Sequence, residues 1–554
     1  MRRKPVNALT LSLLVVAALG ALCPPVYADP YTISWIPSVD GGWEVPANWN
    51  PAREPLPTDD ALISPSPSTP RKVTVTQTHT VGSIDAARKI EINTGGNLTT
   101  GNLTLRYKDG IVANAGVFTA TGTVLADGCD LYAPGGTINV NTLSAYQGAA
   151  GQSAGLRASL GGTLNLTGLT TATAPAGSRL SIVATGGTIN LPNLTTLVPN
   201  GGSFTLSANN SGTLQIPKLT SMDSTTLAIG AATIDTAQLK TFTNGSLFAA
   251  VGATPDLSGL TSVDGSALAA NSGAKISVPN VTTYQAAVVQ VGFPTDFSAR
   301  TAGSLVELAG LTSISAPTGA QHLIYGFDSG VVKLPALNTI HADAPGGVWV
   351  FAQPNGRVEL TLGTLSLTNA NIFLTSTGTI TAGTIDLGAG ALWTGTGTLT
   401  ANLVNTAGTV GPDDPVTPGL GRPLALTGSF AQLAGGTLQI TMEPTAFDSL
   451  TVAGDAALGG TLSVVLDPLY DLPASGSFEI MDIAGQRTGF FDGLPQGARV
   501  LTDNNGVSLY INYSGGDGND VLLSTVPEPG TWAMLGGLGV VFALYGWRRH
   551  RRTR

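Results

Sequence analysis

A short phrase that recurs through the middle of the chain constrains the fold more than any other sequence feature. Its best copies begin with Gly-Thr and end with Leu-Thr, as in Gly162–Thr170 and Gly187–Thr195. The closing apolar residue recurs at intervals of 20 to 30 residues, as Leu143, Leu169, Leu194, Leu219, Leu239, Leu260, Val281, Leu311 and Leu337. A period of this length is typical of a solenoid, in which each repeat forms one turn and stacked turns bury a continuous core.

The apolar residues inside each copy have the spacing of a short strand. They lie at the closing position and three and five places before it, and the first two flank a single polar residue. This alternation places one face of the strand in the core and the other in solvent. Thr236 and Pro255 stand where the pattern expects an apolar residue, so we expect irregular turns around them.

Two kinds of solenoid have turns of this length, the parallel β-helix and the leucine-rich-repeat arc. The Leu-x-x-Leu-Thr ending is compatible with the second. No copy contains an amphipathic helical segment, however, and the connections are rich in Gly and Thr, which favours the β-helix. We therefore predict an all-β fold with a right-handed parallel β-helix over residues 91–402.

The composition argues against a nucleic-acid-binding protein and against a disulfide-bonded one. Charged residues make up 11 % of the chain, against about 25 % in ordinary soluble domains, and the formal net charge is −9. Nucleic-acid binding needs clustered Lys and Arg, which are concentrated here only at the two ends, so we expect no nucleic-acid partner. Cys129 is the one cysteine beyond the first 28 residues, so no disulfide within the exported chain is expected.

The beginning of the chain has the layout of a cleaved secretory signal. A basic start at Arg2, Arg3 and Lys4 precedes an apolar stretch over residues 8–22, and Ala28 ends a Val-Tyr-Ala cleavage sequence. We expect residues 1–28 to be removed on export.

The other end contains three elements in a fixed order. Pro527, Glu528 and Pro529 precede an apolar run over residues 531–547. A helix of this length spans about 26 Å, just enough for a bilayer core, which predicts a single transmembrane helix within residues 526–554. A basic cluster follows and should stay on the cytoplasmic side, made up of Arg548, Arg549, Arg551 and Arg552.

This order of a Pro-Glu-Pro triplet, an apolar helix and a terminal Arg cluster resembles the PEP-CTERM sorting domain. The resemblance implies a secreted or cell-surface protein of a Gram-negative bacterium that produces exopolysaccharide. It also implies a transient stay in the inner membrane and processing of the tail by an exosortase-type enzyme.

The region over residues 29–90 contains Trp35, Trp43 and Trp49 close together. The order of these Trp residues and their neighbours resembles the leader of bacterial extracellular β-solenoid proteins. The three rings could form a platform for a carbohydrate. The interpretation we favour is an aromatic cap that closes the end of the rod, because the ends of a solenoid need covering.

After residue 402 the repeat changes to alternating strands separated by Gly turns, which predicts a small β-rich domain over residues 403–525. The order of these strands resembles the C-terminal end of autotransporter-type passenger domains. The stretch over residues 410–422, rich in Pro, Gly and Asp, is expected to be a linker.

One short motif has a metal-binding interpretation. The sequence over residues 515–523 resembles the nonapeptide that binds calcium in repeat-in-toxin proteins, and Asp517 and Asp520 would supply carboxylate oxygens. That architecture shares each ion between consecutive copies, and a single copy occurs here. The interpretation we favour is a Gly-Asp turn before the last strand, so we expect no cofactor, with calcium as the alternative.

Asp235 and Asp256 are the strongest catalytic candidates. Both occupy the outward position of neighbouring turns, as acidic groups do in β-helical polysaccharide lyases and hydrolases. Mixed polar residues on an exposed strand face need no catalytic explanation, however, and the four histidines have no metal-ligand spacing. We expect the chain not to be an enzyme.

The sequence therefore predicts an exported structural or adhesive β-solenoid protein that is sorted through its C-terminal tail, with exopolysaccharide as its expected partner. Two alternatives remain open. One is a carbohydrate-binding surface protein that uses the three Trp residues, and the other is a β-helical polysaccharide lyase or hydrolase that uses the Asp pair.

Overall fold

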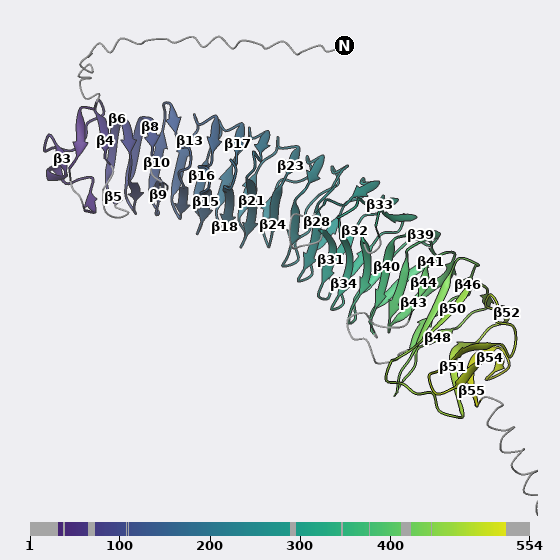
Figure 1. The fold of residues 1–554 in the computed structure, drawn as a ribbon. Coiled ribbons are helices and arrows are strands. Elements are labelled where there is room, and N and C mark those ends of the chain that lie inside the picture. Colours follow the sequence, from purple (N-terminus) through teal and green to yellow (C-terminus); the bar gives the residue numbers. More distant parts are fainter. Residues whose placement is uncertain are drawn as a thin grey trace, which may run out of the picture.

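The described part of the chain is a long, curved stack of β-strand turns. The computed structural model describes residues 31–36, 39–64, 72–106, 108, 110–288, 295–344, 347–375, 377–411, 423–444 and 446–527. These residues form a parallel β-solenoid of about 17 turns. Figure 1 shows the turns stacked from the N-terminal end, in purple, to the C-terminal end, in yellow, with a change of direction near the middle.

A turn in the first half of the rod contains three short strands. In one such turn these are β15 (Ser153–Ser159), β16 (Thr163–Asn165) and β17 (Thr171–Thr173). Each pairs in parallel with its equivalent one turn later, namely β18 (Arg179–Thr185), β19 (Thr188–Asn190) and β20 (Thr196–Val198). The predicted parallel solenoid is confirmed.

Three long sheets run along the rod. The first begins at β3 (Trp49–Asn50) and ends at β25 (Thr233–Ile234), and the third begins at β29 (Lys275–Ser277) and ends at β55 (Asp520–Pro527). The second sheet accompanies both, from β2 (Gly41–Gly42) to β50 (Thr461–Leu466).

The closing apolar residues of the repeat form a column in the core. All nine are buried, with exposed fractions of 0 to 2 %. The Thr that follows lies outside the core and bonds to the turn before it. The hydroxyl of Thr170 donates to the carbonyl oxygen of Ser144 (3.0 Å), and that of Thr195 donates to the carbonyl oxygen of Thr170 (3.2 Å). The Leu-Thr ending thus fills the core and joins consecutive turns.

The outward polar position of the repeat also connects turns. The side-chain amide of Asn165 donates to Oδ1 of Asn139 (2.7 Å), and the amide of Asn190 donates to Oδ1 of Asn165. These bonds run parallel to the backbone ladder of the first sheet. The recurrence of Asn at this position is therefore explained by stacking.

Between the first and third sheets, one turn lacks its strand. Residues 253–258 lie between the levels of β25 and β29 and form no strand. Pro255 has no N–H to give to the ladder, and Thr236 brings a hydroxyl into the core, where it is 2 % exposed. The irregularity predicted around these two residues is confirmed, and it lies near the point where the rod changes direction in Figure 1.

Helix is almost absent from the described residues. They contain one short 3₁₀ turn, η1 (Pro46–Asn48), so the β-helix, and not the leucine-rich-repeat arc, is the correct solenoid. None of their helices is long and apolar enough to cross a membrane. The predicted transmembrane helix, the Arg cluster and the leader lie outside the described residues.

The ladder continues through both boundaries that the sequence suggested. The first, at residue 90, falls within β7 (Lys89–Ile92), and the second, at residue 402, falls within β43 (Thr398–Asn405). Beyond β43, parallel pairing continues to β51 (Gly476–Ile483), because a weaker repeat still alternates buried and outward residues. The last strands are antiparallel, with β54 (Val507–Gly515) and β55 side by side at the end of the rod.

One titratable side chain is fully buried in the core. His322, the first residue of β34 (His322–Phe327), lies between the rings of Tyr284 and Phe297, at centroid distances of 4.5 and 4.4 Å. The hydroxyl of Thr295 donates to the Gln321 carbonyl oxygen, so it accepts a hydrogen bond from Nδ1 of a neutral His322 ring (3.0 Å). Burial lowers the pKa of His322 to about 3.

This buried ring should make the rod less stable in acid. Below pH 6.5 an unfolded His takes up a proton that the folded His322 does not, so the free energy of unfolding decreases down to about pH 3. The loss is about 1.4 kcal/mol per pH unit, or about 2 kcal/mol between pH 7 and pH 5. We expect His322→Phe to reduce the fall in melting temperature over this interval. His341→Phe, at an exposed position, should keep the wild-type fall, and an equal effect of both variants would contradict the assignment.

Candidate functional site

The three Trp residues predicted as a cap or a sugar platform are packed together at the N-terminal end. Trp35, Trp43 and Trp49 are 4 %, 0 % and 0 % exposed. The ring of Trp49 meets those of Trp35 and Trp43 edge to face, at centroid distances of 5.0 and 4.9 Å. Its indole N–H donates to the Trp43 carbonyl oxygen (2.9 Å). The rings form an aromatic cap, and none has a free face on which a sugar could stack.

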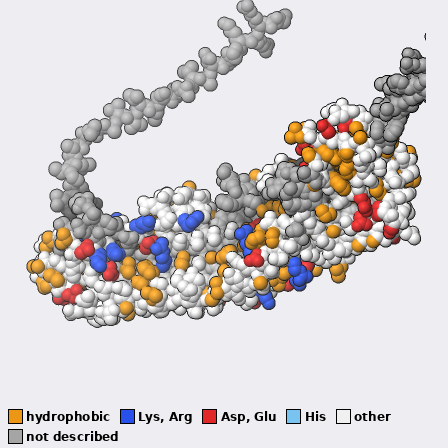
Figure 2. Space-filling view, turned by 90° about the horizontal axis from the view of Figure 1, so that it is seen from below, with side chains coloured by type: hydrophobic (Ala, Val, Ile, Leu, Met, Phe, Trp, Pro, Cys, Tyr) orange, Lys and Arg blue, Asp and Glu red, His pale blue; other side chains and the backbone are white. Residues whose placement is uncertain are grey.

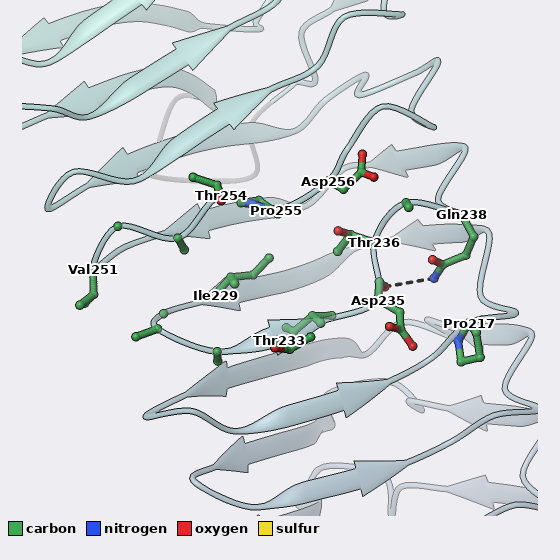
Figure 3. Close-up of a pocket in the computed structure, with 17 residues that line it drawn as sticks. Pro217, Ile229, Thr233, Asp235, Thr236, Gln238, Val251, Thr254, Pro255 and Asp256 are labelled. Atoms are coloured by element: carbon green, nitrogen blue, oxygen red, sulfur yellow. Dashed lines mark hydrogen bonds between the residues drawn. The ribbon is translucent and has the colours of Figure 1, made fainter.

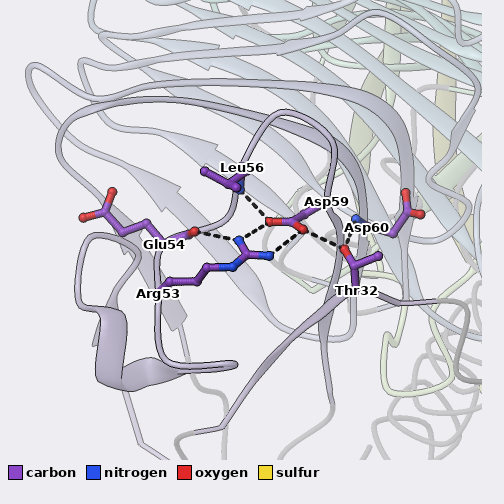
Figure 4. A network of polar contacts seen from close by, with 6 residues as sticks. All are labelled: Thr32, Arg53, Glu54, Leu56, Asp59 and Asp60. Carbon is purple, nitrogen blue, oxygen red and sulfur yellow. Dashed lines mark hydrogen bonds and ion pairs between the residues drawn. The ribbon is translucent and has the colours of Figure 1, made fainter.

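A carboxylate fastens the loop beside this cap. Asp59 accepts hydrogen bonds from the Arg53 guanidinium (Nη2 to Oδ1, 2.8 Å), the Leu56 backbone N–H (2.7 Å) and the Thr32 hydroxyl (2.9 Å). Figure 4 shows these donors converging on the one carboxylate. The Arg53 guanidinium holds the pKa of Asp59 well below its usual range. The arrangement joins three stretches of chain and has no unused reactive group.

Asp235 and Asp256 line a groove beside the turn that lacks a strand. The groove has a volume of about 710 Å³, and its walls include Ile229, Gln238 and Val251. It exists because residues 253–258 do not continue the sheet, which leaves space above β25. The sequence predicted the two carboxylates on neighbouring turns, and the structure places both beside one groove, which the sequence did not predict.

The two carboxylates do not form a catalytic pair in this structure. They point away from each other along the rod axis (Figure 3). Asp235 Oδ2 accepts from the Ile216 backbone N–H (3.1 Å), and Asp256 Oδ1 accepts from the Ser258 hydroxyl and backbone N–H (2.6 and 3.0 Å). The Ser258 hydroxyl lowers the pKa of Asp256. Each carboxylate is therefore bonded to its own part of the chain and does not share a proton with the other.

The C-terminal acidic motif is split between a turn and the core. Asp520 is 4 % exposed and its Oδ1 accepts from the Ile483 backbone N–H (2.7 Å), whereas Asp517 lies on the exposed turn. Antiparallel pairing brings Glu479 and Asp482 of β51 beside Asp520, with carboxylate oxygens of the three residues within 4.8 Å of one another. Desolvation, followed by repulsion from Asp520 and Asp482, raises the pKa of Glu479.

These three carboxylates are a set of hard oxygen donors, which is the chemistry that Ca²⁺ prefers. They differ from the predicted pair, because Glu479 and Asp482 take part and Asp517 does not. Nothing in the motif over residues 515–523 points to a strand about 40 residues earlier, so sequence analysis missed both. Calcium binding here stays a prediction.

A cluster of aromatic residues on the second sheet was also missed. Tyr325 and Phe327 of β34 and Trp349 and Phe351 of β37 (Val348–Ala352) are partly exposed, while the residues that alternate with them are buried. We call these four residues the aromatic face. The pairs Tyr325–Phe327 and Trp349–Phe351 are stacked, with interplanar angles of 13° and 20°. Two tripeptides in the sequence could have predicted this cluster, because Tyr-Gly-Phe and Trp-Val-Phe place aromatic residues at the outward positions of a strand.

The aromatic face has polar groups at its edge. The guanidinium carbon of Arg300 lies 5.5 Å from the centroid of the Tyr325 ring. The Tyr325 hydroxyl donates to Oε1 of Gln353 (2.7 Å). Arg300 belongs to β31 (Thr295–Arg300), which pairs with β34 and places Arg300 opposite Phe327. Apolar rings and hydrogen-bonding groups therefore share one outward surface.

The fold defines the chain as a β-solenoid, and comparison with protein families indicates where the cell sends it. Residues 525–552 match the PEP-CTERM protein-sorting motif. The motif is a substrate signal for exosortase processing and implies export and a cell-surface fate in Gram-negative bacteria. Pro527 ends β55, whereas Glu528, Pro529 and the Arg cluster lie outside the described residues. No curated protein matches the chain.

The contacts of Asp59 predict that the cap depends on its charge. Asp59→Asn keeps the shape but loses the ion pair with Arg53, and we expect it to destabilise the N-terminal turns by about 1.5 kcal/mol. Limited proteolysis should then cut the region before residue 90 faster, while cleavage elsewhere is unchanged. Glu54→Gln, at a more exposed carboxylate nearby, is the matched control. Equal cleavage of both variants would show that Asp59 does not fasten the cap.

Proposed function

We propose that this exported protein is a structural or adhesive rod of the cell surface, without catalytic activity. Its leader would direct export, its C-terminal helix would hold it briefly in the inner membrane, and processing at the sorting motif would release the rod to its final place. We expect the released rod to reside in the extracellular exopolysaccharide matrix.

The observation that carries this proposal is the closed, elongated ladder attached to a sorting motif. About 17 turns at about 4.8 Å each give a rod roughly 80 Å long. The Trp cap lies at one end and antiparallel strands lie at the other, an arrangement that would limit end-to-end strand pairing between copies. A rod of this kind extends from a surface as a separate unit.

The surface of the rod supports the same role. Figure 2 shows a face that is mostly neither charged nor hydrophobic, with acidic side chains at both ends of the rod. The strongest catalytic candidates, Asp235 and Asp256, point apart and are bonded to neighbouring backbone and hydroxyl groups. A passive role in binding or spacing therefore fits the exposed groups better than a chemical step does.

Removing the sorting tail tests where the protein goes. We expect deletion of residues 528–554 to leave the rod folded but to remove it from the cell surface, because the motif and the basic cluster are lost. Fractionation with surface labelling measures the change, and Arg548→Lys, which keeps the charge, is the control. The same amount of truncated and full-length protein at the surface would contradict the proposal.

A second experiment tests the absence of catalysis. We expect the purified chain to leave acidic and neutral polysaccharides at full length, as measured by viscosity and by reducing ends. If it does degrade one of them, and Asp235→Asn with Asp256→Asn abolishes that activity, the groove is an active site and the passive role is wrong.

A further inference from the structure

The aromatic face makes contacts between turns, through the Tyr325 and Phe351 rings and the bond from Tyr325 to Gln353, but most other turns stack without such rings. Aromatic residues make up 6 % of the chain, yet four of them stand together on the outer side of two neighbouring strands. The core beneath them is already filled by the buried residues of the same strands, such as Ile324 and Val350. A cluster of partly exposed aromatic side chains on the outside of a rod is a candidate binding surface.

The equivalent positions on other turns confirm that the solenoid does not need aromatic residues here. Tyr325 and Phe351 belong to one outward column of the second sheet. Earlier in the chain this column contains, in order, Arg157, Val183, Ser207, Ala228, Phe248, Ala269 and Ser298, the last of which is buried. On the turn after Phe351 it contains Phe373, which is 3 % exposed. Most of these side chains are small or polar, so the aromatic face is a local feature and not a repeat requirement.

Arg300 adds a positive charge to this face. Its side chain is 53 % exposed, and its ion pair with Asp296 is long, at 3.9 Å. The guanidinium lies over the Tyr325 ring, which holds its donors beside the aromatic rings. A planar guanidinium fork suits a carboxylate better than it suits any neutral group.

We propose that the aromatic face and Arg300 together bind an acidic polysaccharide. A sugar ring has apolar C–H groups that pack on aromatic side chains and hydroxyl groups that hydrogen-bond with Gln353 and the Tyr325 hydroxyl, while a uronate carboxylate pairs with Arg300. The rod is acidic, and more so once the basic ends are removed, but physiological salt screens charges beyond about 8 Å, so Arg300 acts locally. The inference rests on the proposed surface location, where such a polymer would be met.

Binding of the purified chain to polygalacturonate, with uncharged dextran as the second probe, tests the inference. Affinity electrophoresis should show retardation by polygalacturonate, weakened by salt, and little retardation by dextran. We expect Trp349→Ala with Phe351→Ala to weaken binding roughly tenfold or more, as for residues at the centre of an interface. Arg300→Gln should weaken binding and remove most of its dependence on salt.

Phe248→Ala is the matched control, because Phe248 lies in the same outward column and is 41 % exposed but has no aromatic neighbour in register. It should bind as the wild type does. Circular dichroism checks that the double variant folds, and Arg300→Gln tests the inference even if it does not. Absence of binding, binding to dextran alone, or equal loss in Phe248→Ala would overturn the inference.

The two proposals fail separately. A chain that reaches the cell surface but ignores polygalacturonate overturns this inference and leaves the surface role intact. A chain that binds polygalacturonate but stays at the surface without its tail overturns the sorting proposal and leaves the binding face intact.

Discussion

Each turn of this rod depends on its neighbours, because a single turn can neither bury its inner face nor pair its strands. The column of apolar residues from Leu143 to Leu337 meets the first need, and the parallel backbone ladder meets the second. Outward Thr hydroxyls and Asn amides add bonds between turns. Stability therefore comes from the sum of interfaces between turns, and the chain needs no disulfide to hold it.

This dependence explains where the structure departs from regularity. Where Thr236 and Pro255 interrupt the apolar pattern, the sheet loses one strand, a groove opens and the rod changes direction nearby. Elsewhere the inward positions have almost no freedom, since a change in one turn disturbs both neighbours. Outward positions are less constrained, apart from those whose Thr and Asn side chains bond to the next turn, so differences between turns accumulate on the outside.

The repeat was visible in the sequence because it follows from a local rule, the spacing of apolar residues, and so the solenoid, its buried column and its irregular turn could all be predicted. The burial of Trp49, the opposed directions of Asp235 and Asp256, and the meeting of Glu479 with Asp520 could not. Each depends on how side chains turn or on strands far apart in the sequence. The extent of the ladder was also underestimated, since beyond residue 402 the strands keep pairing although the Leu-Thr ending disappears.

The difference between inward and outward residues also determines which side chains of such a fold indicate a function. Burial alone accounts for His322 and the Trp cap, and stacking accounts for the Asn ladder, so none of these groups needs a ligand to explain it. The aromatic face is different, because the column that contains Tyr325 and Phe351 is built from small or polar residues on most other turns. The rings of this face do contact the neighbouring turn, through Tyr325 with Phe351 and Gln353, but most turns stack without such rings. Their partly exposed faces therefore point to a partner outside the chain.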